Sequence, residues 1–273
     1  MAAAGDILAL DPAWTPSQPS GVAAIGYRDG SWRCAGVAPS YSSFLQLAQG
    51  VAVDWSARPV GGLPDPERLL VAAEALLGEP VGTVTVDMPV SSHPFETRRV
   101  ADNLVSAAYG RFGCGTHTPN KIRPGPLGRE LTRAFTGRGY EVAGADTVPG
   151  GKPALVEVYP HPALLVLLGV DYRVKYKAGK ARKFWPELNA AECRAEVVLV
   201  WAEILNALSE VIEGIELPLP TAPEAMTMTT AALKRYEDAL DALVCGWVGI
   251  EYLGGRCTAF GDTAAAIWTP SLP

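Results

Sequence analysis

Three short apolar runs, each carrying an acid, constrain the fold of this chain more than any other feature. They are ILALD at residues 7–11, VGTVTVD at 81–87 and PALVEVYPHP at 153–162. Uninterrupted apolar runs of this length indicate strands buried on both faces, and such strands belong to parallel sheets covered by helices. The helical patterns that can cross between strands lie at residues 41–56, 66–77, about 188–213 and about 229–252. The sequence therefore predicts an α/β fold.

A hairpin and a terminal strand make the expected sheet mixed rather than purely parallel. Residues 21–38 read as two strands around Asp29 and Gly30, a pair typical of a tight hairpin turn. The run AAAIWTP at residues 264–270 indicates a short last strand. A length of 273 residues suits one large domain, residues 1–273. Within this domain, residues 90–152 are rich in Gly, Pro and Arg and are too long for a simple crossover between strands. We therefore expect an insertion there, at the edge of the sheet where function is located.

The amino-acid composition limits which kinds of protein this chain can be. The hydrophobic content of 48% indicates a hydrophobic core. The net charge of −6 gives no overall sign of nucleic-acid binding, although local basic patches can still bind nucleic acid. Five cysteines without a CxxC pair favour reduced thiols over a disulfide framework or a zinc site. The first residues lack the pattern of a signal peptide, and no run approaches the roughly 18 apolar residues of a membrane span. We therefore expect a cytoplasmic protein with no membrane partner.

The acids of the three runs fall at or near the carboxyl ends of the predicted strands. They are Asp11, Asp87 and Glu157. Ligands of open α/β sheets bind beyond these ends, and carboxylates gathered there repel one another unless a cation lies between them. Because oxygen-only ligands suit Mg²⁺ or Mn²⁺, the pattern indicates a site for one of these metals. The alternative is that each acid only caps the turn after its strand.

Two further acids lie in an apolar helical pattern, YEDALDALVCGW at residues 236–247. Asp238 and Asp241 are three residues apart and share one face of a helix. A carboxylate against an apolar wall needs a partner or a shifted pKa, so we expect both to face the strand-end acids, with Asp241 the stronger candidate for a metal ligand. If the helix begins near Ala239, capping and the helix dipole alone explain Asp238.

Local basic patches offer a place for a polyanion on this acidic chain. Eight Lys or Arg residues lie between residues 98 and 138, and six lie in RVKYKAGKARK at residues 173–183. Near the second patch, Tyr172, Tyr176, Phe184 and Trp185 can stack on bases. The alternative is that these loops are only solvated. Arg98 or Arg99 is expected either to pair with the site carboxylates or to begin an ordinary helix, and His161 either to contact substrate or to make a structural hydrogen bond.

These motifs together resemble a known family. ILALDPAW, VTVDMPV and EDALDALVCGW resemble the acidic motifs of the RNase H-like superfamily, and DALDAL resembles the last motif of bacterial Holliday-junction resolvases. With VEVYPHPALL, KYK at 175–177 and GDTAAAIWTP, the chain resembles the bacterial family called domain of unknown function 429, predicted nucleases of that fold. The resemblance implies an RNase H-like mixed five-stranded sheet, in the order 3-2-1-4-5, flanked by helices and with a long insertion after the fourth strand.

The resemblance also assigns roles to the acids. Asp11 would bridge two metal ions, Asp87 would lie next to it on the fourth strand, and Asp241 or Asp238 would complete the set from the late helix. Glu157 is less standard for this fold and implies a fourth ligand or a departure from the usual site. The implied catalytic residues are Asp11, Asp87, Glu157 and Asp241, and the implied Mg²⁺ or Mn²⁺ ligands are Asp11, Asp87, Asp238 and Asp241.

The sequence therefore favours a metal-dependent nuclease that hydrolyses DNA or RNA at a two-metal carboxylate site. The expected substrate-binding residues are Arg98, Arg99, Lys121, Arg123, His161, Lys175, Tyr176 and Lys177. One alternative is a non-catalytic nucleic-acid or nucleotide-binding protein of the same fold, and another is an enzyme acting on a small phosphate compound. The sequence does not choose between DNA and RNA, and it indicates no oligomeric state.

Overall fold

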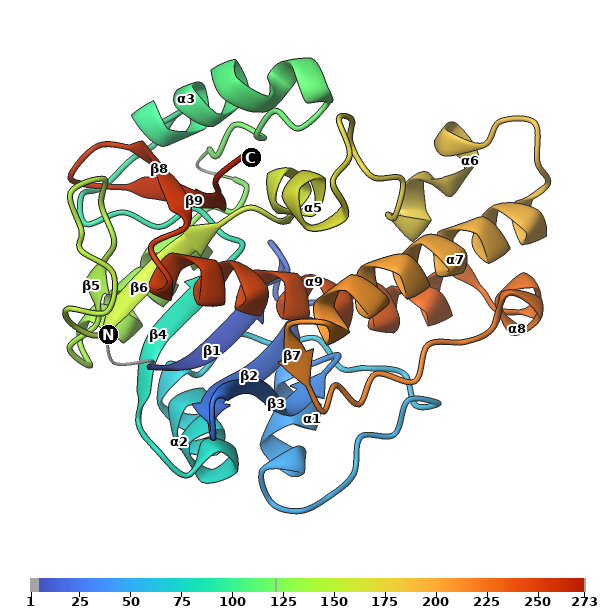
Figure 1. Ribbon diagram of the computed structural model, residues 1–273, viewed down its shortest axis with the longest axis horizontal. Helices are drawn as coiled ribbons and strands as arrows, with labels where there is room; N and C mark the ends of the chain where they lie inside the picture. The colour runs from blue at the N-terminus through green and yellow to red at the C-terminus, as the bar shows by residue number, and fades with distance from the viewer. Residues whose placement is uncertain (1–4, 121, 273) are drawn as a thin grey trace.

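Nine strands form one mixed sheet in the computed structural model, which describes residues 5–120 and 122–272 (Figure 1). The strands are β1 (Asp6–Asp11), β2 (Gly21–Arg28), β3 (Ser31–Ala38), β4 (Val81–Val86), β5 (Glu141–Val142), β6 (Ala154–Val158), β7 (Ile212–Glu213), β8 (Cys257–Gly261) and β9 (Ala266–Pro270). Their order is β7-β3-β2-β1-β4-β6-β9-β8, and β5 also pairs with β6. Strands β1, β2 and β3 are antiparallel neighbours, whereas β1-β4, β4-β6 and β6-β9 are parallel pairs.

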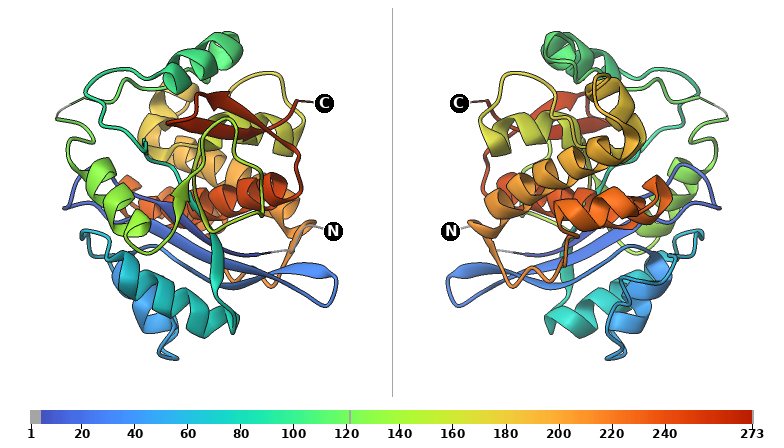
Figure 2. Two further views of the ribbon diagram at one scale, coloured as in Figure 1. Left: turned by 90° about the vertical axis from the view of Figure 1, so that its left-hand side faces the viewer. Right: turned by 90° about the vertical axis from the view of Figure 1, so that its right-hand side faces the viewer.

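Helices cover both faces of this sheet (Figure 2). They are α1 (Tyr41–Leu47), α2 (Pro66–Leu77), α3 (Val100–Tyr109), α4 (Leu127–Thr136), α5 (Pro160–Leu168), α6 (Ala181–Phe184), α7 (Ala190–Ser209), α8 (Ala222–Thr227) and α9 (Thr230–Leu253), with short 3₁₀ turns η1 (Gly110–Phe112) and η2 (Ala178–Lys180). Alternate residues of β1 enter different cores: Ile7 and Ala9 pack with α9 and α7, and Leu8 and Leu10 pack with α1 and α2. Both faces of β1 are therefore buried, as the uninterrupted apolar run predicts.

Several predicted elements are confirmed within the described residues. The hairpin turns at Asp29 and Gly30, both with positive φ, and α2 occupies residues 66–77 as expected. The predicted helix over 41–56 is too long, since α1 ends at Leu47. The predicted strand over 153–162 ends at Val158, because Pro160 begins α5 in the position where a missing backbone N–H costs nothing.

The mixed α/β architecture is confirmed, but the expected sheet of five strands is too small. The sheet also contains β5, β7, β8 and β9. Strands β5 and β7 have two residues each, too few to give a hydrophobic pattern. Between β4 and β6, the stretch expected to be an insertion holds α3, η1, α4 and β5. No helix in the described part of the chain is long and apolar enough to cross a membrane.

Helix α9 lies directly on the central strands because glycines allow close approach. A Cβ atom on Gly21 of β2 would lie 1.8 Å from the backbone oxygen of Asp238. Farther along α9, a Cβ on Gly246 would meet Ile25, and one on Gly249 would meet Thr85. Since Gly21 is the register partner of Asp11 at the end of β1, this contact fixes Asp238 beside the carboxyl end of that strand.

We expect Gly21→Ala to destabilise the fold by about 3 kcal/mol, at the upper end of ordinary overpacking, because the clash is with backbone that cannot rotate away. Urea unfolding followed by circular dichroism measures the loss. Gly62→Ala is the control, because a Cβ atom there meets no atom within 4 Å. Equal stability of the two variants would show that α9 does not pack on Gly21 in this way.

Candidate active site

Asp11 and Asp87 are adjacent at the carboxyl ends of two parallel strands. Leu10 of β1 is in register with Val86 of β4, and the amide of Asp87 donates a 3.1 Å hydrogen bond to the Leu10 carbonyl. Both aspartates are half-buried. The topology thus brings together the two acids that the sequence places after β1 and β4, at the edge where α/β sheets bind ligands.

Helix α9 adds Asp241 and Asp238 to this edge. The helix begins at Thr230, after the N-cap Thr229, so both aspartates lie inside it and the explanation of Asp238 as a capping residue is wrong. Asp241 is fully buried. The Tyr176 hydroxyl donates a 2.7 Å hydrogen bond to its Oδ1, and the Lys177 ammonium donates to its Oδ2.

Lys177 and Lys234 are the basic partners of the acids on α9. Lys177 Nζ lies 3.6 Å from Glu237, whose other carboxylate oxygen accepts a 2.7 Å hydrogen bond from the Ala178 amide. Lys234 lies 3.1 Å from Glu237 and also pairs with Asp238. Glu237 and Lys234 are not among the site residues predicted from the sequence, although their spacing of three residues is a signal of a helical ion pair.

The strand-end carboxylates lack full charge compensation. Desolvation first, and then the neighbouring charges of Asp241 and Glu157, raise the pKa of Asp87 to about 7 against the opposing effect of the Lys177 ammonium. Desolvation and the Asp241 carboxylate also raise the pKa of Asp11 well above its usual range. Desolvation raises the pKa of Asp238 to about 7 against the effect of Lys234.

Asp11 and Asp87 are the acids best placed to hold a metal ion. In residues 5–120 and 122–272, no hydrogen bond or ion pair reaches either carboxylate, whereas Lys177 and Tyr176 already engage Asp241. No group of three or more His, Cys, Asp or Glu side chains in that part of the chain is arranged to hold a metal. Mg²⁺ commonly binds one or two carboxylates and keeps water or phosphate as its other ligands, so the Asp11–Asp87 pair fits one such ion.

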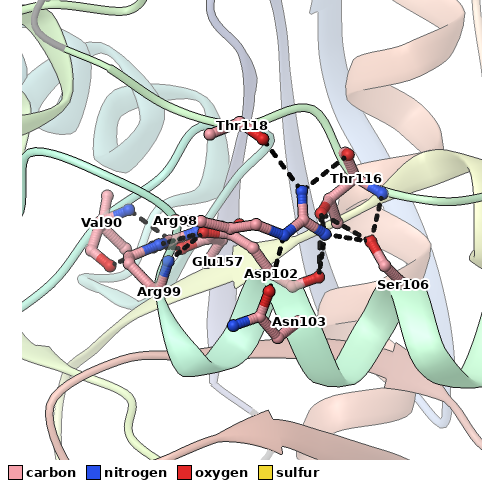
Figure 3. Close-up of polar contacts among 9 residues, drawn as sticks. All are labelled: Val90, Arg98, Arg99, Asp102, Asn103, Ser106, Thr116, Thr118 and Glu157. Carbon is pink, nitrogen blue, oxygen red and sulfur yellow. Dashed lines mark hydrogen bonds and ion pairs between the residues drawn. The ribbon is translucent and has the colours of Figure 1, made fainter.

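Glu157 is held by arginine instead of taking part in the expected ligand set (Figure 3). The residue is 4% exposed, and both carboxylate oxygens accept 2.6 Å hydrogen bonds from the Arg99 guanidinium. The Val90 amide donates a further bond of 2.9 Å. Asp102 accepts from the same guanidinium at 2.9 Å and caps α3 through the Arg99 amide at 2.8 Å. The expected pairing of Arg98 or Arg99 with a site carboxylate is thus formed by Arg99, and Glu157 has no oxygen free of protein donors.

Comparison with known proteins identifies the family. A family model described as a protein of unknown function, DUF429, matches residues 10–266. The chain belongs to the DUF429 family. No curated protein and no solved structure matches it.

In this DUF429 chain, Arg98 ties α3 to the loop that follows it (Figure 3). Its guanidinium donates to the Asp102 carbonyl and the Asn103 side chain, each at 2.7 Å, and to the hydroxyl groups of Thr116 and Thr118, each at 3.1 Å. These acceptors belong to the protein, so Arg98 has few donors left for a substrate.

The remaining predicted substrate-binding residues of the DUF429 chain differ in their exposure to solvent. Lys175 and Arg123 are exposed, and His161 is buried at the start of α5. Lys121 lies outside the described residues. The expectation that Tyr176 stacks on bases is wrong, because its ring is fully buried and its hydroxyl is bonded to a carboxylate.

Proposed function

We propose that this protein hydrolyses phosphodiester bonds of DNA or RNA with a divalent metal ion, Mg²⁺ or Mn²⁺, held by Asp11 and Asp87. The observation that carries the proposal is the adjacency of these two half-buried carboxylates at neighbouring parallel strand ends. Their pKa values are raised, and no cationic side chain in the described ranges pairs with them. A divalent ion is the partner that would remove this repulsion.

We further propose that the fold is RNase H-like. The strand run β3-β2-β1-β4-β6 supports this relation, because it has three antiparallel strands followed by two parallel ones, in the order 3-2-1-4-5. Helix α9, which crosses these strands and carries Asp238 and Asp241, also supports it. The additional strands β9 and β8 extend the sheet beyond that run.

The side chains around the carboxylate pair have defined tasks in this proposal. A bound divalent ion would polarise a phosphate and lower the pKa of an attacking water. Asp11 and Asp87 would supply the metal's carboxylate ligands from the ends of two strands that are in register. Tyr176 and Lys177 hold the buried Asp241 carboxylate in place on α9. The Lys177 side chain remains 22% exposed, so its ammonium can also contact an anionic substrate oxygen.

The Lys177–Asp241 ion pair favours a second candidate, a nucleotide or nucleic-acid binder without turnover. In such a protein the lysine supplies the positive charge that a metal supplies in a nuclease. This candidate predicts salt-sensitive binding without any metal requirement.

We expect the purified protein to cleave nucleic acid with Mn²⁺ and to be inactive in EDTA. Labelled single-stranded and double-stranded DNA and RNA, a four-way junction and mononucleotides form the substrate panel, with products resolved on denaturing gels. Turnover of mononucleotides alone would favour the small-phosphate enzyme. Binding of the polymers without cleavage of any substrate would favour the binder and contradict the nuclease.

A further inference from the structure

Two cationic side chains and two histidines gather around the start of α5, apart from the acids that would hold the metal. We call them the His161 cluster, which consists of His117, His161, Arg173 and Lys180. Arg173, Lys180 and His117 are each close enough to His161 to lower its pKa, and Arg173 and Lys180 also lower the pKa of His117. Arg173 and Lys180 thus bring two positive charges close to two histidines that belong to other segments of the chain.

The cluster has no acidic partner of its own. Across the described residues, no ion pair joins Arg173 or Lys180 to an acid. Arg173 donates through Nη2 to His161 at 2.5 Å and through Nη1 to the Gly113 carbonyl at 3.3 Å, and its buried Nε has no acceptor. A buried arginine donor without an acceptor is uncommon in a folded protein, and it points to a group that binds there.

His161 carries a second unpartnered donor. A guanidinium can only donate, so Nε2 of His161 is the acceptor from Arg173, and the ring carries its proton on Nδ1. Burial and the nearby cations, Lys177 first, lower the pKa of His161 well below its usual range, so the ring is neutral. Its Nδ1–H is buried without an acceptor, in a residue that is 8% exposed.

The cluster lies next to the strand-end carboxylates. His161 is the second residue of α5, which follows β6 directly. The ring of Tyr159 packs edge-on against the His161 ring, with 5.5 Å between the ring centroids. Burial and, after it, the negative charge of Asp87 raise the pKa of Tyr159, so Asp87 lies near this ring. Because Pro160 and Pro162 have no backbone N–H, the first turn of α5 offers few amide donors, and the side chains must supply the binding.

We propose that the His161 cluster binds a phosphate group beside the Asp11–Asp87 pair. A tetrahedral oxyanion would accept hydrogen bonds from Arg173 and Lys180 and bring negative charge to a cluster that has no acid of its own. The inference rests on the proposed function, which it deepens: it assigns the recognition of substrate phosphate to residues other than those that hold the metal. The shared ligand chemistry is a phosphate oxyanion, either free or within a nucleic-acid backbone.

Isothermal titration in EDTA tests the site with two probes, inorganic phosphate and a single-stranded thymidine oligonucleotide. We expect Lys180→Gln and Arg173→Gln to weaken the binding of phosphate about tenfold, the effect of one lost charge-assisted hydrogen bond. Lys152→Gln is the control, because it removes the same charge just before the amino end of β6, at the opposite edge of the sheet, and should leave binding unchanged. If the two variants also bind the oligonucleotide more weakly, the site recognises phosphate within a polymer. If they bind only inorganic phosphate more weakly, the site recognises free phosphate.

The test separates this inference from the nuclease proposal. Asp11→Asn should abolish cleavage and leave phosphate binding in EDTA intact. Nitrogen NMR of labelled histidine gives a second readout, since phosphate should shift the His161 Nδ1–H resonance in the wild type and less in Lys180→Gln. No binding of either probe by the wild type, or equal binding by Lys180→Gln, would overturn the inference, even if Mn²⁺-dependent cleavage is observed.

Discussion

Asp87→Asn is expected to abolish Mn²⁺-dependent cleavage and at the same time to stabilise the fold. Cleavage should fall by about 10³-fold, the order expected when a positioned charged group is removed from a reaction site. The fold should gain stability because the Asp87 carboxylate is partly desolvated and the negative charges of Asp241 and Glu157 also disfavour its ionised form. Opposite signs for activity and stability are typical of a residue kept for function.

The gain in stability depends on pH. The pKa of the Asp87 carboxyl is about 7 in the folded protein and near its ordinary value of 3.8 in the unfolded chain. The folded state therefore binds a proton that the unfolded state has lost, and the wild type loses stability as pH rises from about 4 to about 7. Asparagine does not titrate, so the variant escapes this loss. Its advantage should be small at pH 4 and reach a few kcal/mol above pH 7, since one pKa unit corresponds to about 1.4 kcal/mol.

Urea unfolding in EDTA at pH 5 and pH 8 measures this difference, with cleavage assayed on the same samples. Asp146→Asn is the control because it removes an exposed carboxylate from a loop, and it should change neither property. A loss of stability in Asp87→Asn that is the same at both pH values would show that the aspartate supports the fold and would remove the basis for a metal at this position.

The sequence predicted the elements whose pattern is local. The hairpin at Asp29 and Gly30 follows from residues that tolerate positive φ, and α2 follows from an apolar helical run with Pro66 at its start. The adjacency of Asp11 and Asp87 was also predictable, because both follow buried strands and parallel strands share a carboxyl edge. Predicting these features requires only the local sequence and one rule about the topology of parallel sheets.

The partners of the remaining acids were not predictable in the same way. Arg99 is 58 residues from Glu157 in the chain, and Lys177 is 64 residues from Asp241. The sequence around an arginine or lysine in a loop does not reveal whether the side chain contacts solvent, substrate or a buried carboxylate. Tyr176 shows the consequence, since it reads as an exposed aromatic in a basic loop and is in fact a buried donor to Asp241. Only the packing of the loop onto α9 decides between these roles.

We expect Arg99→Met to destabilise the protein by about 3–5 kcal/mol, because it leaves Glu157 charged and buried without a cation. The arginine and glutamate side chains are 6% and 5% exposed, so water cannot replace the lost bonds. Urea unfolding of the single variant measures the loss. Arg256→Met is the control: that arginine is 58% exposed and pairs with Glu251 at the surface, where an ion pair contributes about 0–1 kcal/mol.

The double variant Arg99→Met/Glu157→Met separates a structural glutamate from a catalytic one. Replacing both members of a buried ion pair by apolar side chains of similar size commonly restores stability, so the double variant should be clearly more stable than Arg99→Met. If Glu157 serves only to anchor Arg99 and α3, the double variant should also keep the Mn²⁺-dependent cleavage, because Asp11 and Asp87 remain in register. A double variant that recovers stability but loses cleavage would contradict a purely structural role and would show that Glu157 takes part in the reaction.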